Sequence, residues 1–373
     1  TIQGLGADVL TISGGGATRI FLILSPASLV NISDLTLIRG NGVGLAPNLG
    51  GAILVSGNVA VEINRCVFDS NGVTGDSAQG GALLISGNVS DIIINDTTFS
   101  NNSVSSNSSP LSGAIEYSGD NGNLVINRCT FNNNSVTGSI GSTLAGAIGI
   151  FGEDNSLTVT NSTFSENSTH CTDDNCVSGG GALFLQGSGS SFILNNSTFS
   201  NNSVSCSGPN CIVGGDTIAS DDAPLITLYS SIITTDSNIG NCGEFSGSVN
   251  INSLGYNITD DDTCINGSEP GDRPNTDPGL SPAGLRDNGG FTETIAISEV
   301  SAAFDTGDPA CPPPSTDQRG IERPQAAVCD VGAYQLIVRD IPTMNEWGMI
   351  AAAAGLGLIG VWFAARRRKA ADS

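Results

Sequence analysis

The chain has 373 residues, a formal net charge of −23 and a pI near 4.1. Hydrophobic residues make up 39% and fall in short β-branched clusters between many glycines, which excludes an intrinsically disordered polymer. A surface this acidic repels phosphate backbones, so we expect no nucleic acid among its partners.

A repeated unit organises residues 50–215. Each copy has a Gly-Ala step, then a phenylalanine 16 or 17 residues later, then an asparagine three positions beyond it. The phenylalanines are Phe68, Phe99, Phe131, Phe164 and Phe199. The asparagines are Asn71, Asn102, Asn134, Asn167 and Asn202. Successive phenylalanines lie 31, 32, 33 and 35 residues apart, so length varies in the loop after the asparagine.

Each unit contains three short apolar runs separated by Gly, Asn, Asp and Ser, as in GGALLISG, SDIIIND and TTFSN. Three strands per unit without helical periodicity predict an all-β fold, a right-handed parallel β-helix over 1–240 that is incomplete at its N-terminus. Stacked repeats would align the phenylalanines as an internal ladder, and the asparagines as an amide ladder at a turn in left-handed conformation. A β-propeller is disfavoured because its blades need about 40–45 residues.

The GGA[IL] and FxxN motifs resemble the repeats of chlamydial polymorphic outer-membrane proteins and of the wider pectate-lyase-like superfamily. The resemblance implies a surface-exposed, adhesin-type role.

Ten cysteines indicate disulfides if the chain is exported. Two C-x4-C loops allow pairing within loops (Cys171–Cys176 and Cys206–Cys211), which we favour, or between stacked rungs (Cys171–Cys206 and Cys176–Cys211). A four-cysteine metal site is a minor alternative. We expect two further disulfides, Cys242–Cys264 and Cys311–Cys329. Cys66 and Cys129 lie two rungs apart, at about 9.6 Å, and are expected to be buried free thiols.

Residues 241–336 are rich in Pro, Asp and Gly and are expected to cover the open end of the β-helix. Segments NTDPGL, LRDNGGFTETIAI, SAAFDTGDPAC and DQRGIERPQAAVCDVGAYQ resemble the end region of choice-of-anchor Q domain surface proteins. Two cations and four carboxylates of this region are expected to form structural ion pairs and turn caps: Arg319, Arg323, Asp305, Asp308, Asp317 and Asp330. A Ca²⁺ site at Asp305 and Asp308 is the alternative, and no other cofactor is expected.

The C-terminal sequence predicts a linker and sorting motif at 337–345, then a transmembrane helix with a basic end at 346–369. The motif residues are Ile341, Pro342, Thr343, Trp347 and Gly348. The basic residues, expected in the cytoplasm, are Arg366, Arg367, Arg368 and Lys369.

This tail resembles the IPTL-type sorting signal of Gram-negative bacteria, with Met344 where the family has Leu. The resemblance implies an inner-membrane stage, recognition by an exosortase-like transpeptidase, and transfer to the cell surface. A permanent anchor is the alternative. Because the chain starts at Thr1, we interpret it as a processed or truncated product that lacks its export signal.

Catalytic motifs are absent from the sequence, and the repeats offer four arginines, Arg19, Arg39, Arg65 and Arg128, one histidine, His170, and no lysine. The candidate carboxylates are scattered over strand ends and loops: Glu62, Asp91, Asp96, Glu116, Glu153 and Asp154. We therefore expect a non-enzymatic structural or adhesive protein that binds an extracellular glycan or cell-surface ligand through the variable loops. A polysaccharide lyase or glycosidase is the alternative, which a cleft with two or more carboxylates and an arginine would favour.

Overall fold

The structure is a computed structural model that describes residues 1–26, 29–88, 91–235, 237, 239–245 and 249–338. It also describes five isolated residues: Ala354, Leu356, Leu358, Ile359 and Trp362. Thr1–Leu336 form one compact unit, and Ile337–Ser373 form a second unit.

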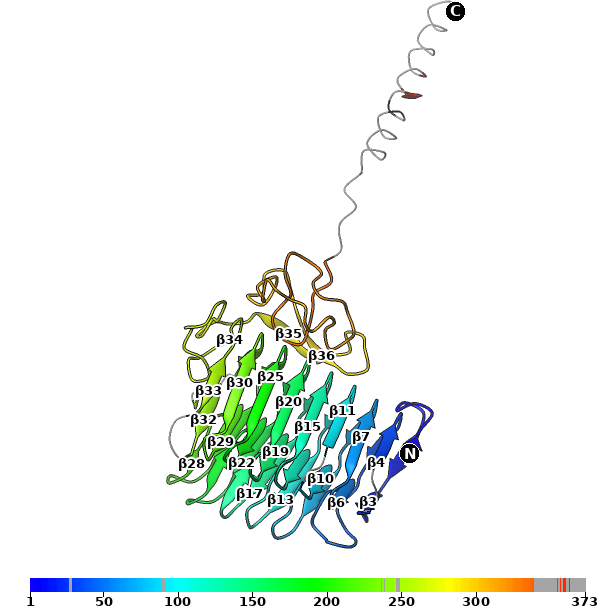
Figure 1. The fold of residues 1–373 in the computed structure, drawn as a ribbon, viewed down its shortest axis with the longest axis vertical. Coiled ribbons are helices and arrows are strands. Elements are labelled where there is room, and N and C mark those ends of the chain that lie inside the picture. Colours follow the sequence, from blue (N-terminus) through cyan, green and yellow to red (C-terminus); the bar gives the residue numbers. More distant parts are fainter. Residues whose placement is uncertain are drawn as a thin grey trace, which may run out of the picture. The chain divides into compact units, whose positions relative to one another are not determined.

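Three long parallel sheets wind along the first unit as a β-solenoid (Figure 1). Sheet A pairs β1 (Ile2–Gln3), β4 (Leu29–Ser33), β7 (Ala60–Asn64), β11 (Asp91–Asn95), β15 (Asn123–Asn127), β20 (Ser156–Thr160), β25 (Ser191–Asn195), β30 (Leu225–Tyr229) and β33 (Ile251–Ser253). Sheet B pairs β2 (Thr11–Ser13), β5 (Thr36–Ile38), β8 (Val67–Asp69), β12 (Thr98–Ser100), β16 (Thr130–Asn132), β21 (Thr163–Ser165), β26 (Thr198–Ser200), β31 (Ile232–Thr234) and β34 (Ile258–Thr259). Sheet C pairs β3 (Phe21–Leu24), β6 (Ile53–Ser56), β10 (Leu83–Ser86), β14 (Ile115–Ser118), β19 (Ile148–Phe151), β24 (Leu183–Gln186), β29 (Ile218–Asp221) and β32 (Cys242–Glu244). The predicted parallel β-solenoid is confirmed, and its sheets continue past residue 240 to Thr259.

The loops that follow each repeat asparagine add two smaller parallel sheets. Sheet E pairs β9 (Gly72–Thr74), β13 (Ser103–Ser106), β17 (Ser135–Gly138), β22 (Ser168–Cys171) and β27 (Ser203–Cys206). Sheet D pairs β18 (Ser142–Leu144), β23 (Val177–Gly179) and β28 (Ile212–Val213). The variable loops therefore form ordered parallel sheets of their own, which stack in the same rungs as the solenoid.

The repeat phenylalanines form the predicted ladder inside the solenoid. All five are fully buried, and consecutive ring centroids lie 4.6, 5.0, 4.6 and 4.7 Å apart with interplanar angles of 12° or less. Equivalent residues pair directly across sheet B, as Phe99 does with Phe68 and Phe131. Stacking at one rung per repeat thus encloses the apolar face that a single repeat leaves open.

The repeat asparagines form the predicted amide ladder. The side-chain amide of Asn102 donates to Oδ1 of Asn134 at 2.9 Å and to the carbonyl of Phe68 at 2.9 Å. Oδ1 of Asn134 also accepts the backbone N–H of Asn102 at 3.1 Å, so one side chain satisfies several buried backbone groups. The left-handed conformation was predicted for these asparagines, and this was wrong: the positive φ belongs to the preceding residue, such as Asn101 at 55°.

The Gly-Ala step permits close approach between rungs. A Cβ added to Gly81 would lie 2.0 Å from the carbonyl oxygen of Gly113 on the next rung. Only a residue without a side chain fits there. The following alanine, Ala82, accepts two backbone N–H groups, from Ala52 and Ile53, at 2.9 Å each.

Residues 277–336 lie along the flank of the solenoid beside sheet B, not over its open end as predicted (Figure 1). A column of outward threonines receives them: Thr130 donates to the carbonyl of Glu293 at 2.6 Å, and Thr163 donates to Gln318 at 2.6 Å. The hydroxyl of Thr198 accepts the N–H of Ala333 at 3.0 Å. In the segment before it, β32, β33 and β34 continue the three sheets to Thr259, and Cys264 and Ile265 then pack into the core at the last rungs, which agrees with the predicted cover for this part.

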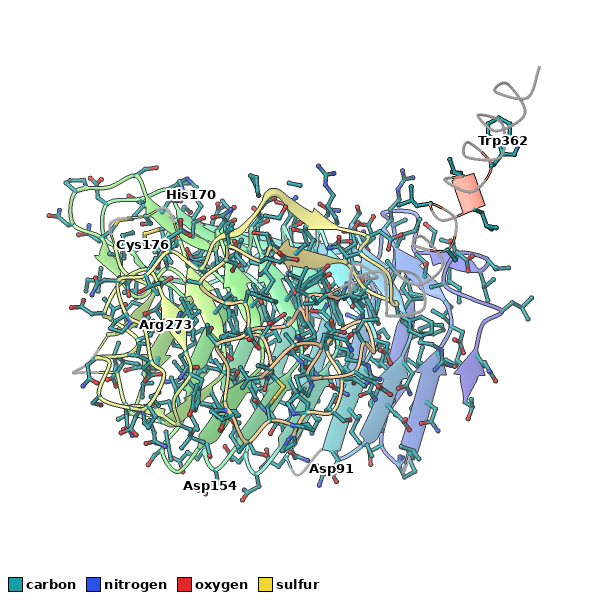
Figure 2. All side chains as sticks on the ribbon, turned by 90° about the horizontal axis from the view of Figure 1, so that it is seen from above. Asp91, Asp154, His170, Cys176, Arg273 and Trp362 are labelled. Carbon is teal, nitrogen blue, oxygen red and sulfur yellow. A yellow bond between two sulfur atoms is a disulfide. The ribbon has the colours of Figure 1, made fainter. Side chains whose placement is uncertain are left out.

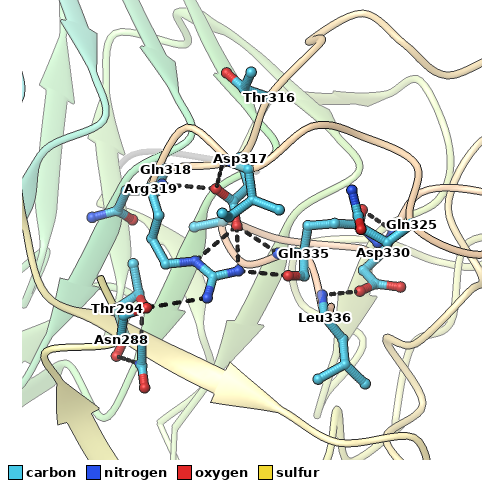
Figure 3. A network of polar contacts seen from close by, with 12 residues as sticks. Asn288, Thr294, Thr316, Asp317, Gln318, Arg319, Gln325, Asp330, Gln335 and Leu336 are labelled. Atoms are coloured by element: carbon cyan, nitrogen blue, oxygen red, sulfur yellow. Dashed lines mark hydrogen bonds and ion pairs between the residues drawn. The ribbon is translucent and has the colours of Figure 1, made fainter. Parts of the chain in front are cut away.

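The antiparallel hairpin of β35 (Leu280–Arg286) and β36 (Thr294–Ile297) begins this flanking region. Behind it, Asp317 holds Arg319 in an ion pair of 2.7 Å in which both side chains are almost fully buried (Figure 3). Arg319 also lies over the ring of Tyr334, 3.6 Å from its centroid. Arg323 is buried and donates to the carbonyls of Asp330 and Gly332 at 2.7 and 2.6 Å. The predicted ion pairing is thus present at Asp317–Arg319, whereas Arg323 binds backbone carbonyls and forms no ion pair among the described residues.

Four disulfides close the pairs favoured from the sequence: Cys171–Cys176, Cys206–Cys211, Cys242–Cys264 and Cys311–Cys329. Cys66 and Cys129 are free and buried, as predicted. Burial raises the pKa of the Cys66 thiol to about 11 and that of Cys129 to about 12, so neither is a ready nucleophile at neutral pH.

The sorting motif, the basic end and nearly all of the expected transmembrane segment lie outside the described residues. Within the part of the chain that is described, no helix has the length and apolar composition of a membrane span.

Replacing Asn134 by alanine is expected to lower the free energy of unfolding by about 3 kcal/mol, because several buried backbone and amide groups lose their partner. Urea denaturation followed by circular dichroism measures the loss. Asn133→Gly is the matched control: Asn133 is exposed with a φ of 53°, which glycine accepts, so we expect a change within about 0.5 kcal/mol. Equal losses in both variants would contradict a stabilising role for the amide ladder.

Candidate functional site

A column of alternating charges follows the corner between sheets A and B. Asp34, Arg65, Asp96 and Arg128 occupy this position in four consecutive repeats. Each has a positive φ, between 51° and 60°, so their side chains leave the corner in the same way. The rung spacing of about 4.8 Å brings each aspartate within reach of the next arginine.

Each arginine donates two hydrogen bonds to the aspartate of the preceding rung. Arg65 contacts the two carboxylate oxygens of Asp34 at 2.6 and 2.9 Å, and Arg128 contacts those of Asp96 at 2.7 Å each. The hydrogen bond from Arg65 is the main cause that lowers the pKa of Asp34, and the same bond raises the pKa of Arg65. Both groups are held in their charged forms.

A cleft of about 580 Å³ opens beside this column, and we call it the charged cleft. Its walls come from the loop before β2, the corner residues and the tip of the β35–β36 hairpin. Four aspartates, one arginine and one phenylalanine contribute side chains to the lining: Asp8, Asp34, Asp96, Asp287, Arg65 and Phe291. Phe291 is 69% exposed, and the Arg65 guanidinium lies 5.9 Å from its ring centroid.

Sequence reasoning singled out only Asp96 and Arg65 among these residues. A signal for Asp34 existed, because it precedes Arg65 by one repeat length, and Arg65 precedes Asp96 by one more. No periodic signal links Asp8, Asp287 or Phe291 to the column, since these residues reach the cleft from segments outside the repeat.

The remaining candidate carboxylates do not join this cleft. Glu62 accepts a hydrogen bond from Asn64 at 2.9 Å on sheet A. Asp91 and Asp154 lie on the opposite side of the solenoid from His170 (Figure 2). Glu153 and Asp154 are in an exposed turn between β19 and β20.

The loops after the repeat asparagines form a second hollow, which we call the loop groove. It encloses about 420 Å³ between the outer face of sheet C and sheet D. Three aromatic rings line it, with Phe151 and Phe184 5.4 Å apart and Phe184 and Phe245 5.9 Å apart. His170 lies on neighbouring sheet E, where its Nδ1 contacts the hydroxyl of Ser205 at 2.8 Å.

The two aspartates of the proposed Ca²⁺ site have separate structural partners. Asp308 accepts the hydroxyl of Tyr229 at 2.6 Å and the N–H of Ala310 at 2.7 Å. Asp305 accepts the N–H of Val328 at 2.6 Å. These contacts fit turn capping and docking of the flanking region.

Glu116 has an environment unlike that of the other carboxylates. It points outward from β14 in a column that continues with Leu84 and Gly149 on the neighbouring rungs, and it is fully buried beneath the loops. Its carboxyl makes no hydrogen bond of normal geometry within the described residues, although the Ser112 hydroxyl partly opposes the effect of burial. Burial therefore raises its pKa well above the usual value.

Comparison with known proteins returned no matching family model, no matching curated protein and no matching solved structure.

Replacing Glu116 by leucine, the residue of the preceding rung, is expected to stabilise the protein by roughly 2 kcal/mol at pH 7. In the wild type, ionisation of this carboxyl lowers the free energy of the unfolded chain more than that of the folded chain, because the folded state buries the charge. Stability is therefore lost as the pH rises above the unfolded pKa, and the gain from leucine should shrink near pH 4. Urea titrations at both pH values test this, with Glu116→Gln as a control that removes the ionisation but keeps a buried polar group. A wild-type-like pH dependence in both variants would exclude Glu116 as its source.

Proposed function

We propose that the chain is a non-enzymatic, surface-displayed solenoid that binds a neutral or amino-bearing glycan in the charged cleft. The observation that carries the proposal is the combination of an exposed aromatic ring with carboxylates and a guanidinium around one hollow. The C–H face of a sugar ring can pack on Phe291, while its hydroxyls donate to Asp96 or Asp287 and accept from Arg65.

The choice of glycan follows from charge. The cleft is lined by four aspartates and one arginine, within a chain of net charge −23. A polyanionic polysaccharide would be repelled both at long range and on contact, whereas neutral and amino sugars would not. This supports binding of uncharged or cationic cell-surface and matrix polymers.

A polysaccharide-degrading enzyme is the second candidate, and the convergence of several aspartates with Arg65 in one cleft favours it. Asp34 and Asp96 stand two rungs apart on the same cleft, and glycosidases use two carboxylates that face one hollow. Both carboxylates are nevertheless held by two arginine hydrogen bonds each. A general acid must carry a proton at working pH, and such pairing opposes it. Binding without turnover is therefore our first choice.

The tail supports display at a cell surface. We propose that Ile341, Pro342, Thr343, Trp347 and Gly348 are read by an exosortase-like transpeptidase while the apolar segment and basic end hold the chain in the inner membrane. We also take the solenoid to be right-handed, the usual hand of parallel β connections. Export would provide the oxidising environment that the four disulfides need.

Phe291→Ala is expected to weaken glycan binding about tenfold, a loss of roughly 1.4 kcal/mol, because the sugar loses its stacking platform. Pull-down on insoluble chitosan and cellulose, with alginate as the polyanion, measures it. Ile140→Ala, which removes another exposed apolar side chain far along the sequence, should leave binding unchanged.

The same samples separate the two candidates. We expect no new reducing ends or unsaturated products from any polymer. Product release by the wild type that disappears in Asp96→Asn would establish the enzyme instead, and binding to alginate alone would refute the charge argument.

Tail processing is tested with a chain that carries an added export signal and an N-terminal tag, expressed in hosts with and without an exosortase-like enzyme. We expect intact mass spectrometry to show loss of the C-terminal segment only where the enzyme is present, and Pro342→Ala to prevent the loss. Pro324→Ala, outside the motif, is the control. A full-length tail in both hosts would rule out processing and favour a permanent anchor.

A further inference from the structure

Two consecutive loops bring four cysteine sulfurs together, and we call this group the cysteine cluster. Cys171 ends β22 and Cys206 ends β27, and the two residues pair directly in sheet E. Cys176 and Cys211 lie at the far ends of the same loops, immediately before β23 and β28. The equal length of the loops therefore stacks one C-x4-C segment on the other.

The sulfur atoms are close across the loops as well as within them. Sγ of Cys176 lies 3.7 Å from Sγ of Cys206 and 3.9 Å from Sγ of Cys211. The sulfurs of Cys171, Cys176 and Cys206 all lie within 4.8 Å of one another. A tetrahedral zinc site with Zn–S bonds of about 2.3 Å has sulfur–sulfur edges of about 3.8 Å. The distances from Cys176 to Cys206 and to Cys211 match those edges.

We propose that the reduced loops form a four-thiolate site for a thiophilic divalent cation such as Zn²⁺, and that this site alternates with the two disulfides. Each disulfide takes two electrons and two protons from a dithiol, which becomes a disulfide, or two electrons from a phosphine, which becomes the phosphine oxide while water supplies the oxygen atom and the two protons. Binding of the cation then releases the four thiol protons, so the filled site carries a net charge of −2. Two equivalents of a disulfide oxidant then remove four electrons from the four thiolates, which re-forms the two disulfides, frees the metal and leaves the oxidant as dithiols that take their protons from water.

The surroundings explain why the metal would be required for the thiolates to persist. The carbonyl oxygen of Asp173 lies 3.4 Å from Sγ of Cys176 and of Cys211, where it would accept the S–H of a reduced thiol but would repel a thiolate. Asp173 and Asp174 add negative charge within the loop. Cys171 and Cys176 are also buried, at 0% and 1% exposure. A bound dication would offset these unfavourable effects.

The disulfide state and the metal-bound state link different parts of the chain. Each disulfide closes one loop on itself, and between the loops the backbone bonds are Ser207 N–H to Cys171 O at 2.9 Å and Ile212 N–H to Cys176 O at 3.0 Å. A metal ligated by all four sulfurs would tie consecutive rungs together. The metal-bound cluster would then stabilise the contact between two consecutive rungs while the chain is in a reducing compartment, before the disulfides form.

Cobalt titration tests the site. The full chain is reduced anaerobically with a phosphine, and Co²⁺ is added. We expect one Co²⁺ per chain, with thiolate-to-metal charge-transfer absorption and the visible bands of tetrahedral Co²⁺, displaced by Zn²⁺ and absent from the oxidised chain. Cys171→Ser/Cys206→Ser should abolish these bands. Cys311→Ser/Cys329→Ser, which removes a disulfide outside the cluster, should keep them.

A second measurement avoids reduction of the folded chain. Protein expressed in a reducing cytoplasm with added zinc is analysed for metal content and for alkylation of its cysteines. We expect one zinc per chain and protection of the four cluster thiols until a chelator is added. Octahedral cobalt spectra, bands unchanged in Cys171→Ser/Cys206→Ser, or zinc-free chains whose cluster thiols alkylate at once would overturn the proposal.

Discussion

Direct stacking of equivalent residues, one repeat per rung, is the constraint on which the rest of this molecule depends. The buried asparagine column enforces it, because each side chain must find both the amide of the next rung and a carbonyl of the rung before. A slip by one residue would bury an unpaired amide and expose a phenylalanine at the same time. The register is therefore fixed by polar and apolar columns together.

Given that register, side chains at equivalent positions of successive repeats stack in a column. A column differs from a plain structural ladder only where its residue type changes from one rung to the next. The corner column changes from aspartate to arginine and back, which produces paired charges instead of a stack of like charges. The sheet B column becomes threonine over four rungs and receives the flanking region. Glu116 follows three leucines in its column, comes before Gly149, and is buried without a charged partner in an ion pair among the described residues.

These distinctions explain what the sequence could predict. The phenylalanine and asparagine ladders, the within-loop disulfides and the free thiols all follow from spacing along a repeat, which is visible in one dimension. The position of residues 277–336 was predicted wrongly because docking on the flank depends on hydroxyls whose outward direction is a property of the folded strand. Asn101 and its equivalents took the left-handed turn because their side chains point to solvent, which leaves the buried Asn102 in an ordinary conformation. Only the part of the charged cleft that the repeat supplies could be predicted from the sequence, since Asp287 and Phe291 reach the cleft from outside the repeat.

The environments of the arginines in this acidic chain indicate which kind of ligand the charged cleft can bind. Arg19 is buried and donates to backbone carbonyls around the loop that includes Leu45, and Arg323 donates to two more in the flanking region. Burial lowers the pKa of both guanidiniums, that of Arg323 to about 10, yet each remains charged near neutral pH. Arg65 differs, because its side chain is 39% exposed and faces a cleft with an aromatic ring. Its partner Asp34 keeps it charged and fixes its direction, so it is a preorganised hydrogen-bond donor rather than a base. A donor held in this way, beside carboxylate acceptors and an exposed ring, suits recognition of hydroxyl-rich ligands more than proton transfer.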